Sequence, residues 1–407
     1  VGGDSISTTS GAISVTGTGI GGGADIWLGG GTSISSSSSS VTLTGDSMDL
    51  TGTVAGGAVV HLLTRTAGTP ISLGTEVAGQ LSLTNSELNL ITAGALQIGG
   101  DVAETFTEDF SSLALPAGLA QDGTAVTFGG GNALFNGSGD AARTYVRTIT
   151  SDYFTRDFTA EMTVTMGSHI AFFGMGTGLR DPLWFNSTLG GLIDFKLHPS
   201  SVGGGQTIVS DFDPSVHDNG LPAQNQNLGN AGSGTHRLQI TWDADTQTAV
   251  AAVDMNYAGG PFVADLVSAP IDGSDNGFNA SNVSIYFGGA DNNAFDDLVI
   301  TSTVRPNINI SGATISSPVT FVGNNITVSA LNAGGNNVNF DGATVTPSGF
   351  GVDITAGTLS FAGGSLGLAI NGATADSQYQ QLNVSGGVNL TGVQLNLTGA
   401  FVPGAGN

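Results

Sequence analysis

Ile310-Ser-Gly-Ala-Thr-Ile315 returns twice in this chain, as Phe340-Asp-Gly-Ala-Thr-Val345 and as Ile370-Asn-Gly-Ala-Thr-Ala375. The three copies start 30 residues apart, and self-similarity at such a period indicates a stacked repeat. Between them lie short alternating runs such as Val352-Asp-Ile354 and Leu359-Ser-Phe361, separated by Gly, Asn or Ser. Several short strands in each repeat favour one coil of a right-handed parallel β-helix over a helical repeat.

Composition narrows the function classes. The chain has 407 residues, more than one compact core usually holds, and only 10% of them are charged. A net charge of -24 repels phosphate backbones and anionic bilayers, so we expect no nucleic-acid partner. No apolar run approaches twenty residues, so we expect no membrane insertion in this segment. Cysteine is absent, which excludes disulfides and thiolate chemistry. Because the chain starts at Val1 inside repeat-like sequence, we expect a piece of a longer exported protein.

The composition of residues 104–303 differs from that of the rest of the chain, which indicates an inserted segment. Residues 104–303 contain six of the eight basic residues, four of the five His and most of the Phe. Their strands are longer and strictly alternating, as in His236-Arg-Leu-Gln-Ile-Thr-Trp242, which predicts a half-buried antiparallel sandwich. The sequence therefore predicts an all-β chain with three segments: a β-helix over 1–103, an inserted sandwich over 104–303, and a further β-helix over 304–407.

Two stretches in the repeat segments resemble a known family. Ile91-Thr-Ala-Gly-Ala-Leu-Gln-Ile-Gly99 follows Leu83-Thr-Asn-Ser-Glu-Leu88, and Gln378-Tyr-Gln-Gln-Leu-Asn-Val-Ser-Gly386 lies near the other end. These resemble repeats of bacterial surface proteins of the filamentous-haemagglutinin and autotransporter type, although Gln380 stands where Asp is usual. The resemblance covers about the first and last hundred residues. It implies a parallel β-helix solenoid in an extracellular or cell-surface protein.

The insert carries a second resemblance. Glu108-Asp-Phe110, the Trp242 strand with the Ala249-Val-Ala-Ala-Val-Asp254 strand after it, and Phe295-Asp-Asp-Leu-Val-Ile300 resemble concanavalin-A-like, laminin-G-like jelly rolls. The resemblance implies a jelly-roll β-sandwich whose first and last strands adjoin. Such a module can be inserted into a host fold without distorting it.

Catalytic patterns in the chain lack their usual context. Gly363-Gly-Ser-Leu-Gly367 fits a nucleophile motif, but no His follows His236. The insert has no Glu-x-Asp-x-x-Glu strand, and Glu161 stands alone among Thr and Met. We therefore expect no enzyme and name no catalytic residue.

Calcium is the expected cofactor. Asp272, Ser274 and Asn276 occupy positions 1, 3 and 5 of an EF-hand-like loop, with Gly277 at position 6 and Val283 in place of the bidentate Glu. A second candidate, suggested by the jelly-roll resemblance, joins Asp109 to Asp296 and Asp297 where the first and last strands meet. The alternative is that these acidic residues cap turns or face solvent, as most Asp residues do.

The best ligand-binding stretch is Gly178-Leu-Arg-Asp-Pro-Leu-Trp-Phe-Asn186. Within it, Arg180 and Asp181 can hydrogen-bond sugar hydroxyls while Trp184 and Phe185 stack on a ring. The alternative places Trp184 and Phe185 in the core of the sandwich.

The function expected from the sequence is that of an adhesin-like bacterial surface protein, a rod-like scaffold that presents a carbohydrate-binding jelly roll. Glycans of a host or neighbouring cell, and adjoining β-helix coils of the same or another molecule, are the expected partners. Two alternatives stay open: a self-assembling extracellular filament or matrix protein, and a polysaccharide-degrading enzyme.

Overall fold

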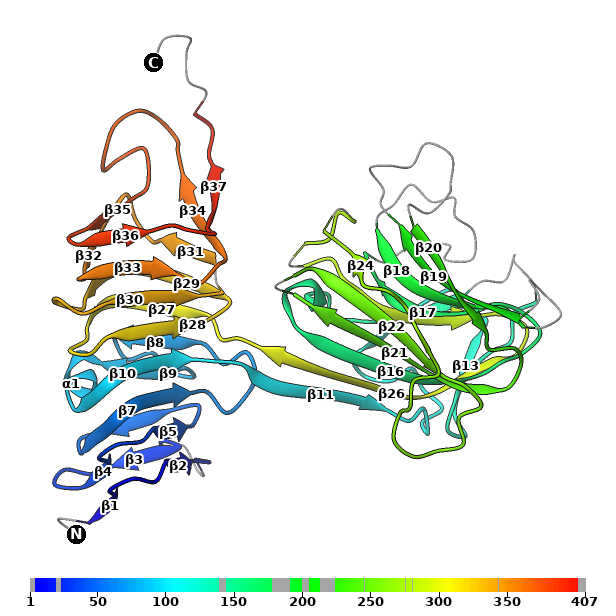
Figure 1. Ribbon diagram of the computed structural model, residues 1–407, viewed down its shortest axis with the longest axis horizontal. Helices are drawn as coiled ribbons and strands as arrows, with labels where there is room; N and C mark the ends of the chain where they lie inside the picture. Colours follow the sequence, from blue (N-terminus) through cyan, green and yellow to red (C-terminus); the bar gives the residue numbers. More distant parts are fainter. Residues whose placement is uncertain are drawn as a thin grey trace. The chain divides into compact units, whose positions relative to one another are not determined.

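A computed structural model of the chain describes residues 4–19, 23–138, 144–177, 191–199, 205–212, 224–244, 246–274, 276–279, 281–342 and 344–401 (Figure 1). The predicted all-β class is confirmed. The helical elements among the described residues are α1 (Asn85–Leu88) and a 3-10 turn at Tyr153–Thr155. The chain forms two compact units: unit 1 contains Val1–Val102 and Val304–Asn407, and unit 2 contains Ala103–Thr303. No helix described here is long and apolar enough to cross a membrane.

Unit 1 contains three sheets of short strands. The ten-strand sheet consists of β1 (Ser5–Thr8), β2 (Ile13–Thr16), β4 (Ser33–Ser36), β5 (Val41–Thr44), β7 (Thr53–Leu63), β10 (Ile91–Gly99), β28 (Val319–Val322), β30 (Val338–Asp341), β33 (Thr358–Phe361) and β36 (Gly387–Asn389). A nine-strand sheet consists of β8 (Ile71–Gly74), β9 (Leu81–Thr84), β27 (Ile308–Thr314), β29 (Asn325–Asn332), β31 (Thr344–Pro347), β32 (Gly351–Thr355), β34 (Ser365–Ala369), β35 (Gln381–Val384) and β37 (Gln394–Thr398). The third sheet pairs β3 (Ile26–Leu28) with β6 (Met48–Leu50).

The strands of unit 1 pair in parallel across the point where unit 2 is inserted. In the ten-strand sheet β10 pairs with β28, which joins residues 96–99 to residues 319–322. In the nine-strand sheet β8 pairs with β27, and Ile71 lies opposite Ile308. Figure 1 shows the resulting rows of strands running from blue through cyan and yellow to red within this unit. The two ends of the chain therefore build one continuous hydrophobic core.

The expected 30-residue spacing of the repeats does not hold in the middle of unit 1. Strands that lie side by side contain residues 18 to 21 apart in the middle of the unit: Ile310 pairs with Val328, Phe321 with Phe340, and Val338 with Leu359. Spacings near 30 residues occur in the first and last rows, as in the pairings of Ile13 with Val41 and of Val352 with Leu382. The marker hexapeptides are not equivalent positions, because Ile310 is in β27 of the nine-strand sheet and Phe340 is in β30 of the ten-strand sheet.

Identical columns of apolar side chains fill the interior of unit 1. Phe321, Phe340 and Phe361 occupy successive positions of one column, and their ring centroids are 5.5 Å apart at both steps. Strands β30 and β31 alternate strictly, so that every second residue enters the core and the others are half-buried. This in-register stacking follows from the two-residue period of a strand, because a one-residue slip would turn the whole column outward.

Unit 2 is built from two antiparallel sheets. A nine-strand sheet consists of β11 (Val102–Glu108), β13 (Val126–Phe128), β14 (Ala133–Phe135), β16 (Phe158–Thr165), β21 (Thr235–Asp243), β22 (Thr248–Asp254), β23 (Leu266–Val267), β24 (Ile271–Asp272) and β26 (Asn293–Val304). The seven-strand sheet consists of β12 (Leu119–Asp122), β15 (Thr144–Thr148), β17 (Ala171–Gly176), β18 (Leu192–Leu197), β19 (Gln206–Phe212), β20 (Gln224–Asn230) and β25 (Ser284–Gly289). Strands β11 and β26, the first and last of the unit, are neighbours.

The two sheets of unit 2 share a large aromatic core. Trp242 is 1% exposed and its indole N–H donates to the carbonyl oxygen of Phe154 at 3.1 Å. Phe173, Phe195 and Phe287 reach the same core from three neighbouring strands of the seven-strand sheet. The alternation of the strand that contains Trp242 thus serves packing within the sandwich.

Candidate functional site

The central strands of the seven-strand sheet, β17, β18 and β25, are buried on both faces, and the second face is polar. In β18, Ile193, Phe195 and Leu197 belong to the main core of unit 2, whereas Leu192 packs in a separate small cluster with Phe172 and Tyr286. Side chains alternate along a strand, so Asp194 and Lys196 lie on the side of Leu192. We call this side, defined by Phe172, Asp194, Lys196 and Tyr286, the polar face.

A hydrogen bond crosses the centre of the polar face. The hydroxyl of Tyr286 donates to the Oδ2 atom of Asp194 at 3.1 Å, and the Asp194 side chain is completely buried. Between them lies Gly174, which pairs with Asp194 of β18 on one side and with Tyr286 of β25 on the other. A Cβ atom at Gly174 would lie 2.5 Å from the carbonyl oxygen of Ile193. Glycine is therefore required for the tyrosine to reach the carboxylate.

Positive charge accompanies the carboxylate. Lys196, two residues along β18, is 4% exposed. Burial lowers the pKa of His198, and the charges of Lys196 and His169 lower it further. His198 is therefore neutral at pH 7 and can donate or accept a hydrogen bond there. Burying this many titratable groups away from the core costs free energy, which is a feature of functional sites.

Aromatic rings surround the hydrogen bond. The ring of Tyr286 has its centroid 6.1 Å from that of Phe172 and 6.4 Å from that of Tyr145. Arg147, two residues after Tyr145 in β15, forms an ion pair of 3.2 Å with Asp122 of the neighbouring strand β12. A carboxylate, a phenol, an ammonium group and aromatic rings are the kinds of group that bind a polyhydroxylated ring through hydrogen bonds and stacking, and they gather here on one buried face of the sheet.

Sequence reasoning did not identify the polar face. The one available signal was the strand Leu192-Ile-Asp-Phe-Lys-Leu197, in which two opposite charges interrupt an apolar run with a spacing of two. Such spacing places both charges on one side of a strand. The partner Tyr286 is 92 residues away from Asp194, and no local pattern links the two.

The predicted ligand-binding residues cannot be placed. Arg180, Asp181, Trp184 and Phe185 all lie outside the described residues. The proposal that they bind sugar therefore rests on their residue types alone.

The EF-hand-like donors make hydrogen bonds within the protein. Asp272 and Ser274 are exposed, and the Asp272 carboxylate accepts the backbone N–H of Ser274 at 2.9 Å. Asn276 is completely buried, and its side-chain amide donates to the carbonyl oxygen of Leu192 at 3.2 Å. Hydrogen bonding to Ser274 lowers the pKa of the Asp272 carboxyl. These contacts describe a turn that is anchored to β18.

The second predicted acid cluster is partly assembled. Strands β11 and β26 adjoin, and the charge of Asp109 contributes to raising the pKa of Asp296, after burial and alongside Asp297. Asp297 has a φ of 50°, and its N–H donates to the Oδ1 atom of Asp296 at 2.7 Å. Asp109 accepts the N–H of Ser111. Within the described part of the chain, no three His, Asp or Glu side chains gather as a metal site would require.

The acid and the hydroxyl weighed for catalysis, Glu161 and Ser365, have structural partners. Glu161 accepts the guanidinium of Arg237 at 2.9 Å and the amide of Gln239 at 2.8 Å on the neighbouring strand. Ser365 lies in β34 among parallel strands, and its hydroxyl donates to Thr344 at 3.1 Å. Neither arrangement resembles a strand, sharp turn and helix around a nucleophile.

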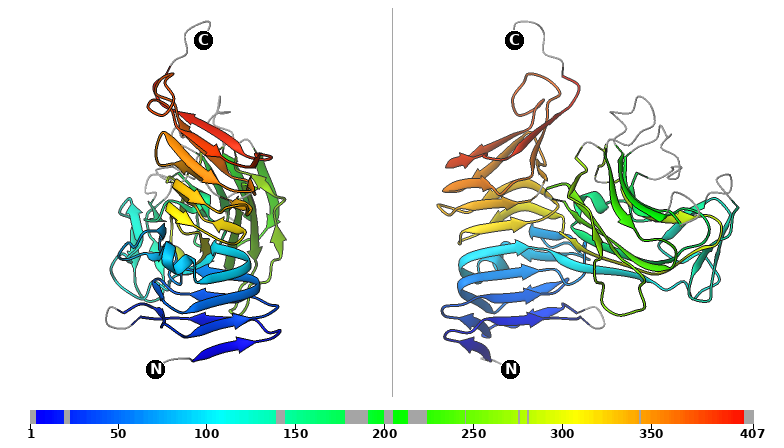
Figure 2. Two further views of the ribbon diagram at one scale, coloured as in Figure 1. Left: turned by 90° about the vertical axis from the view of Figure 1, so that its left-hand side faces the viewer. Right: turned by 45° about the vertical axis from the view of Figure 1, so that its right-hand side comes forward.

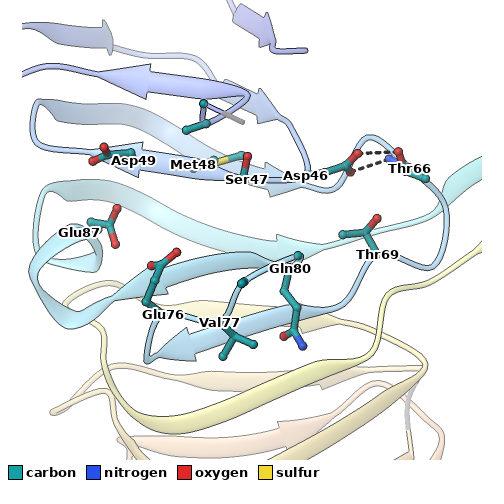
Figure 3. A pocket seen from close by; sticks show the side chains of 14 residues that line it. Asp46, Ser47, Met48, Asp49, Thr66, Thr69, Glu76, Val77, Gln80 and Glu87 are labelled. Carbon is teal, nitrogen blue, oxygen red and sulfur yellow. Dashed lines mark hydrogen bonds between the residues drawn. The ribbon is translucent and has the colours of Figure 1, made fainter. Parts of the chain in front are cut away.

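Unit 1 contains an acidic pocket of about 710 Å³ that sequence reasoning missed. Figure 3 shows Asp49, Glu76 and Glu87 on one side of this pocket and Asp46, Thr66 and Thr69 on the other. Glu87 is already engaged: it closes the N-terminal turn of α1 as a capping box with Thr84 and accepts the N–H of Leu50 at 3.0 Å. The acids of the pocket come from residues 46 to 87, and no single sequence motif connects them.

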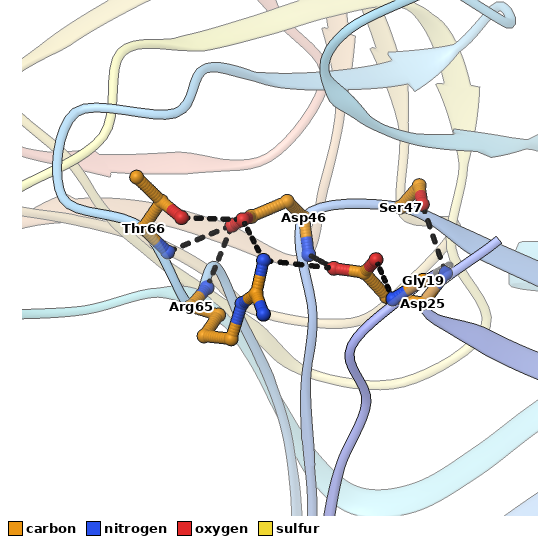
Figure 4. A network of polar contacts seen from close by, with 6 residues as sticks. All are labelled: Gly19, Asp25, Asp46, Ser47, Arg65 and Thr66. Atoms are coloured by element: carbon orange, nitrogen blue, oxygen red, sulfur yellow. Dashed lines mark hydrogen bonds and ion pairs between the residues drawn. The ribbon is translucent and has the colours of Figure 1, made fainter. Parts of the chain in front are cut away.

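A polar network closes one end of the pocket (Figure 4). Arg65 bridges the two carboxylates of Asp46, at 3.1 Å, and Asp25, at 3.8 Å. Burial tends to raise the pKa of Asp46, but hydrogen bonds from Thr66 and Arg65 outweigh it and hold this pKa below its ordinary value. The network therefore fixes the loop after β7 to the loop before β6.

Glu76→Gln is expected to raise the unfolding temperature of unit 1 at pH 7. Burial, followed by the charges of Glu87 and Asp49, raises the pKa of Glu76. A carboxyl with a raised pKa stabilises the fold when protonated, and this contribution is lost as the pH rises through the folded-state pKa. The side chain is exposed, so screening keeps the gain small. Calorimetry from pH 7 downwards should show the difference from the wild type disappearing below about pH 4.5.

The control for this measurement is Asp4→Asn, which removes one negative charge from an exposed position elsewhere in unit 1. It should leave the unfolding temperature almost unchanged relative to the wild type at every pH of the series. A lower unfolding temperature for Glu76→Gln at pH 7 would mean that the ionised carboxylate has a stabilising partner.

Comparisons with known proteins found partial structural similarity only. No family model matches the chain, and no curated protein matches it. Among solved structures, the acidic lectin of winged bean, complexed with methyl-α-D-galactose, is 9% identical, with a TM-score of 0.35, and the match covers 49% of this chain and 98% of the lectin. Lectin II from Ulex europaeus is 12% identical, with a TM-score of 0.35 and coverages of 49% and 98%. The endo-1,3-β-glucanase from Streptomyces sioyaensis is 11% identical, with a TM-score of 0.34 and coverages of 50% and 96%.

Proposed function

We propose that the chain belongs to an adhesin-like extracellular bacterial surface protein, in which unit 1 is a right-handed parallel β-helix and unit 2 is a jelly-roll module that binds carbohydrate. The module binds its ligand without cleaving it. The observation that carries the binding function is the buried hydrogen bond from Tyr286 to Asp194 on the polar face.

Support for the β-helix comes from the strand registers of unit 1. Each strand pairs in parallel with a strand from a neighbouring row, and the same columns continue on both sides of the insertion. In a stack of this kind each row packs only against the neighbouring rows. The stack can therefore be long without a thick core. Such a scaffold suits a protein that carries an inserted binding module.

Support for carbohydrate binding comes from the chemistry of the polar face. Asp194 and Lys196 supply acceptors and donors, while Phe172, Tyr145 and Tyr286 supply rings. The net charge of -24 disfavours polyanionic ligands, which leaves neutral sugars as the better class. Glu161, on which polysaccharide cleavage would be expected to depend, is held by Arg237 and Gln239 in the other sheet.

Asp194→Asn is expected to weaken glycan binding at least about tenfold, which corresponds to 1.4 kcal/mol. The substitution keeps the shape of the side chain and an acceptor for Tyr286, but it removes the negative charge beside Lys196. The full chain would first be screened on a glycan array in Ca²⁺ and again in a chelator, and the affinity for the best sugar would then be measured by titration calorimetry.

The matched control is Asp265→Asn, which removes an exposed acid from unit 2 outside the polar face and should bind as the wild type does. Silence of the wild-type chain on every sugar would contradict the binding function. Release of reducing ends from a bound polysaccharide, lost in Glu161→Gln, would instead favour a polysaccharide-degrading enzyme. A signal that the chelator removes would assign Ca²⁺ a role in binding.

A further inference from the structure

The acidic pocket of unit 1 lies where two sheets meet without strand pairing. Strand β6 pairs with β3, and β9 pairs with β8, so the ladders of the described strands do not join β6 to β9. Glu87 bridges this break, because one carboxylate oxygen accepts the N–H of Leu50 at 3.0 Å and the other accepts the N–H of Thr84 at 2.8 Å. The rows concerned form the blue to cyan part of unit 1 (Figure 2). The break leaves a hollow of about 710 Å³ beside β6.

An exposed tryptophan stands beside this pocket. Trp27 of β3 is 70% exposed and lies opposite Asp49 of β6, which lines the pocket. Paired residues of neighbouring strands point to the same side of a sheet and lie about 4.8 Å apart. This side is the outer one, because Ile26 and Leu28 on either side of Trp27 belong to the core. Strand pairing extends a sheet within its own plane, so the exposure of Trp27 follows from the alternation of side chains along β3.

The acids nearest to Trp27 have no basic partner. Within the described part of the chain, no Arg or Lys side chain forms an ion pair with Asp49, Glu76 or Glu87. Their charges are close enough to interact, since burial raises the pKa of Glu76 and the charges of Glu87 and Asp49 raise it further. They are too far apart for a metal ion, because no three acidic or His side chains among the described residues gather as a metal site would require. The pocket therefore concentrates negative charge that a larger cation could neutralise.

The other end of the same pocket shows how acids of this region hold a cation. The guanidinium of Arg65 lies 3.1 Å from the carboxylate of Asp46 and 3.8 Å from that of Asp25. Trp27 lies two residues after Asp25, and Asp49 lies three residues after Asp46. The acid therefore recurs on the same two segments, with an indole beside it in place of a second acid. A guanidinium can donate two hydrogen bonds to such a carboxylate and stack on such an indole.

A second hollow continues the pocket along the outside of unit 1. It has a volume of about 350 Å³ and shares Val77 and Gln80 with the acidic pocket. Amide and hydroxyl side chains line it: Asn307, Asn309, Asn325 and Thr327. Amide side chains both donate and accept hydrogen bonds, as the N–H and C=O groups of a peptide main chain require. The two hollows together therefore offer more room than a single guanidinium needs, and they change from acidic to neutral along their length.

We propose that the acidic pocket is the docking site of a basic, extended segment of another protein, which places an arginine side chain between Trp27, Asp49 and Glu76. The main chain of the segment lies along the amide-lined hollow. Charge complementarity identifies this occupant, because a chain with a net charge of -24 and eight basic residues attracts a basic partner. Arginine fits better than lysine, since its flat group stacks on the indole while it donates to a carboxylate. This partner is additional to the glycan proposed for unit 2, and neither proposal depends on the other.

Fluorescence anisotropy of a labelled peptide of alternating Arg and Gly, titrated with the full chain, tests this proposal. The wild type is expected to bind the peptide. Trp27→Ala and Asp49→Asn are each expected to weaken binding about fivefold, because each removes one partly exposed contact to the guanidinium. Glu76→Gln should weaken binding by a similar factor while it raises the unfolding temperature, so that a loss of the site is distinguished from a loss of the fold.

The controls remove the same groups elsewhere in unit 1. Asp353→Asn removes one negative charge from an exposed position of β32 between two buried residues, and it keeps an acceptor for the side-chain amide of Asn383. Phe350→Ala removes an aromatic ring that is 40% exposed. Both variants should bind the peptide as the wild type does. A peptide with citrulline in place of arginine has the same shape without the charge, and it should not bind.

Four results would overturn the proposal. The first is a wild type that does not bind the peptide. The second is equal weakening in Asp49→Asn and Asp353→Asn, which would indicate non-specific attraction to an acidic chain. The third is free arginine amide that displaces the peptide at an equal concentration, which would indicate a site for small amines. The last is loss of glycan binding in Trp27→Ala on the array, which would assign the tryptophan to a sugar site instead.

Discussion

Phe340→Ala is expected to lower the free energy of unfolding of unit 1 by about 3–5 kcal/mol. The side chain is completely buried between Phe321 and Phe361, which lie in the rows on either side of it. Its removal takes away two ring contacts of 5.5 Å and leaves a hole that the parallel sheet cannot close. Because neighbouring rows hold each other, the loss should be felt on both sides of the hole.

Calorimetry of the full chain would measure this effect, with the transition of unit 2 as an internal reference. Phe350→Ala is the control, since it makes the same chemical change in unit 1 at a side chain that is 40% exposed. It should lower the stability of the unit by well under 1 kcal/mol, as is usual for surface positions. Equal losses for the two variants would mean that the phenylalanine column does not hold the rows together.

The strands were predictable from the sequence, but their partners were not. Short runs such as Leu359-Ser-Phe361 form strands because apolar and polar residues alternate between turn residues. The true spacing of the column, from Phe321 to Phe340 to Phe361, is visible in the sequence only once the pairing is known. The Gly-Ala-Thr markers were more conspicuous, yet they fall in different sheets. Exact sequence repetition was therefore a poorer guide than the recurrence of one large apolar residue.

The polar face shows the same limit for function. Asp194 and Lys196 could have been assigned to one side of a strand from their spacing, but not to the side that faces away from the main core. That assignment depends on Phe173, Phe195 and Phe287, which fill the other side. The metal candidates show a related limit: Asp272, Ser274 and Asn276 have the right spacing in sequence, but the spacing does not reveal that the side-chain amide of Asn276 donates to the carbonyl oxygen of Leu192 in β18.

Gly174 connects the fold of unit 2 to its proposed function. It sits between Asp194 and Tyr286 in adjacent strands, and the absence of a side chain leaves the space in which their hydrogen bond forms. Nearby, a Cβ atom at Gly288 would lie 2.5 Å from the ring of Phe172. Glycines in the middle of strands weaken a sheet. Two of them beside one polar cluster therefore indicate that the space on this face is needed despite the loss of stability.

Gly174→Ala is therefore expected to lower the stability of unit 2 by about 1–3 kcal/mol and to abolish glycan binding. The new Cβ atom would lie 2.5 Å from the carbonyl oxygen of Ile193 and from the Cβ atom of Asp194. The first of these is a backbone atom, so β17 and β18 must move apart, and the carboxylate moves away from the hydroxyl of Tyr286. Calorimetry gives the stability of the unit, and titration with the best array sugar gives the binding.

Two further variants distinguish an effect on the stability of unit 2 from an effect on ligand binding. Gly349→Ala adds the same methyl group where nothing lies within 4 Å, and it should leave unit 2 unchanged and stabilise unit 1 by up to about 1 kcal/mol. Tyr286→Phe keeps the ring and removes only the donor to Asp194, so it should lose binding while the sheet keeps its spacing. If Gly174→Ala left both stability and binding intact, the polar face would accommodate the added methyl group. The hydrogen bond at its centre would then not depend on the missing side chain.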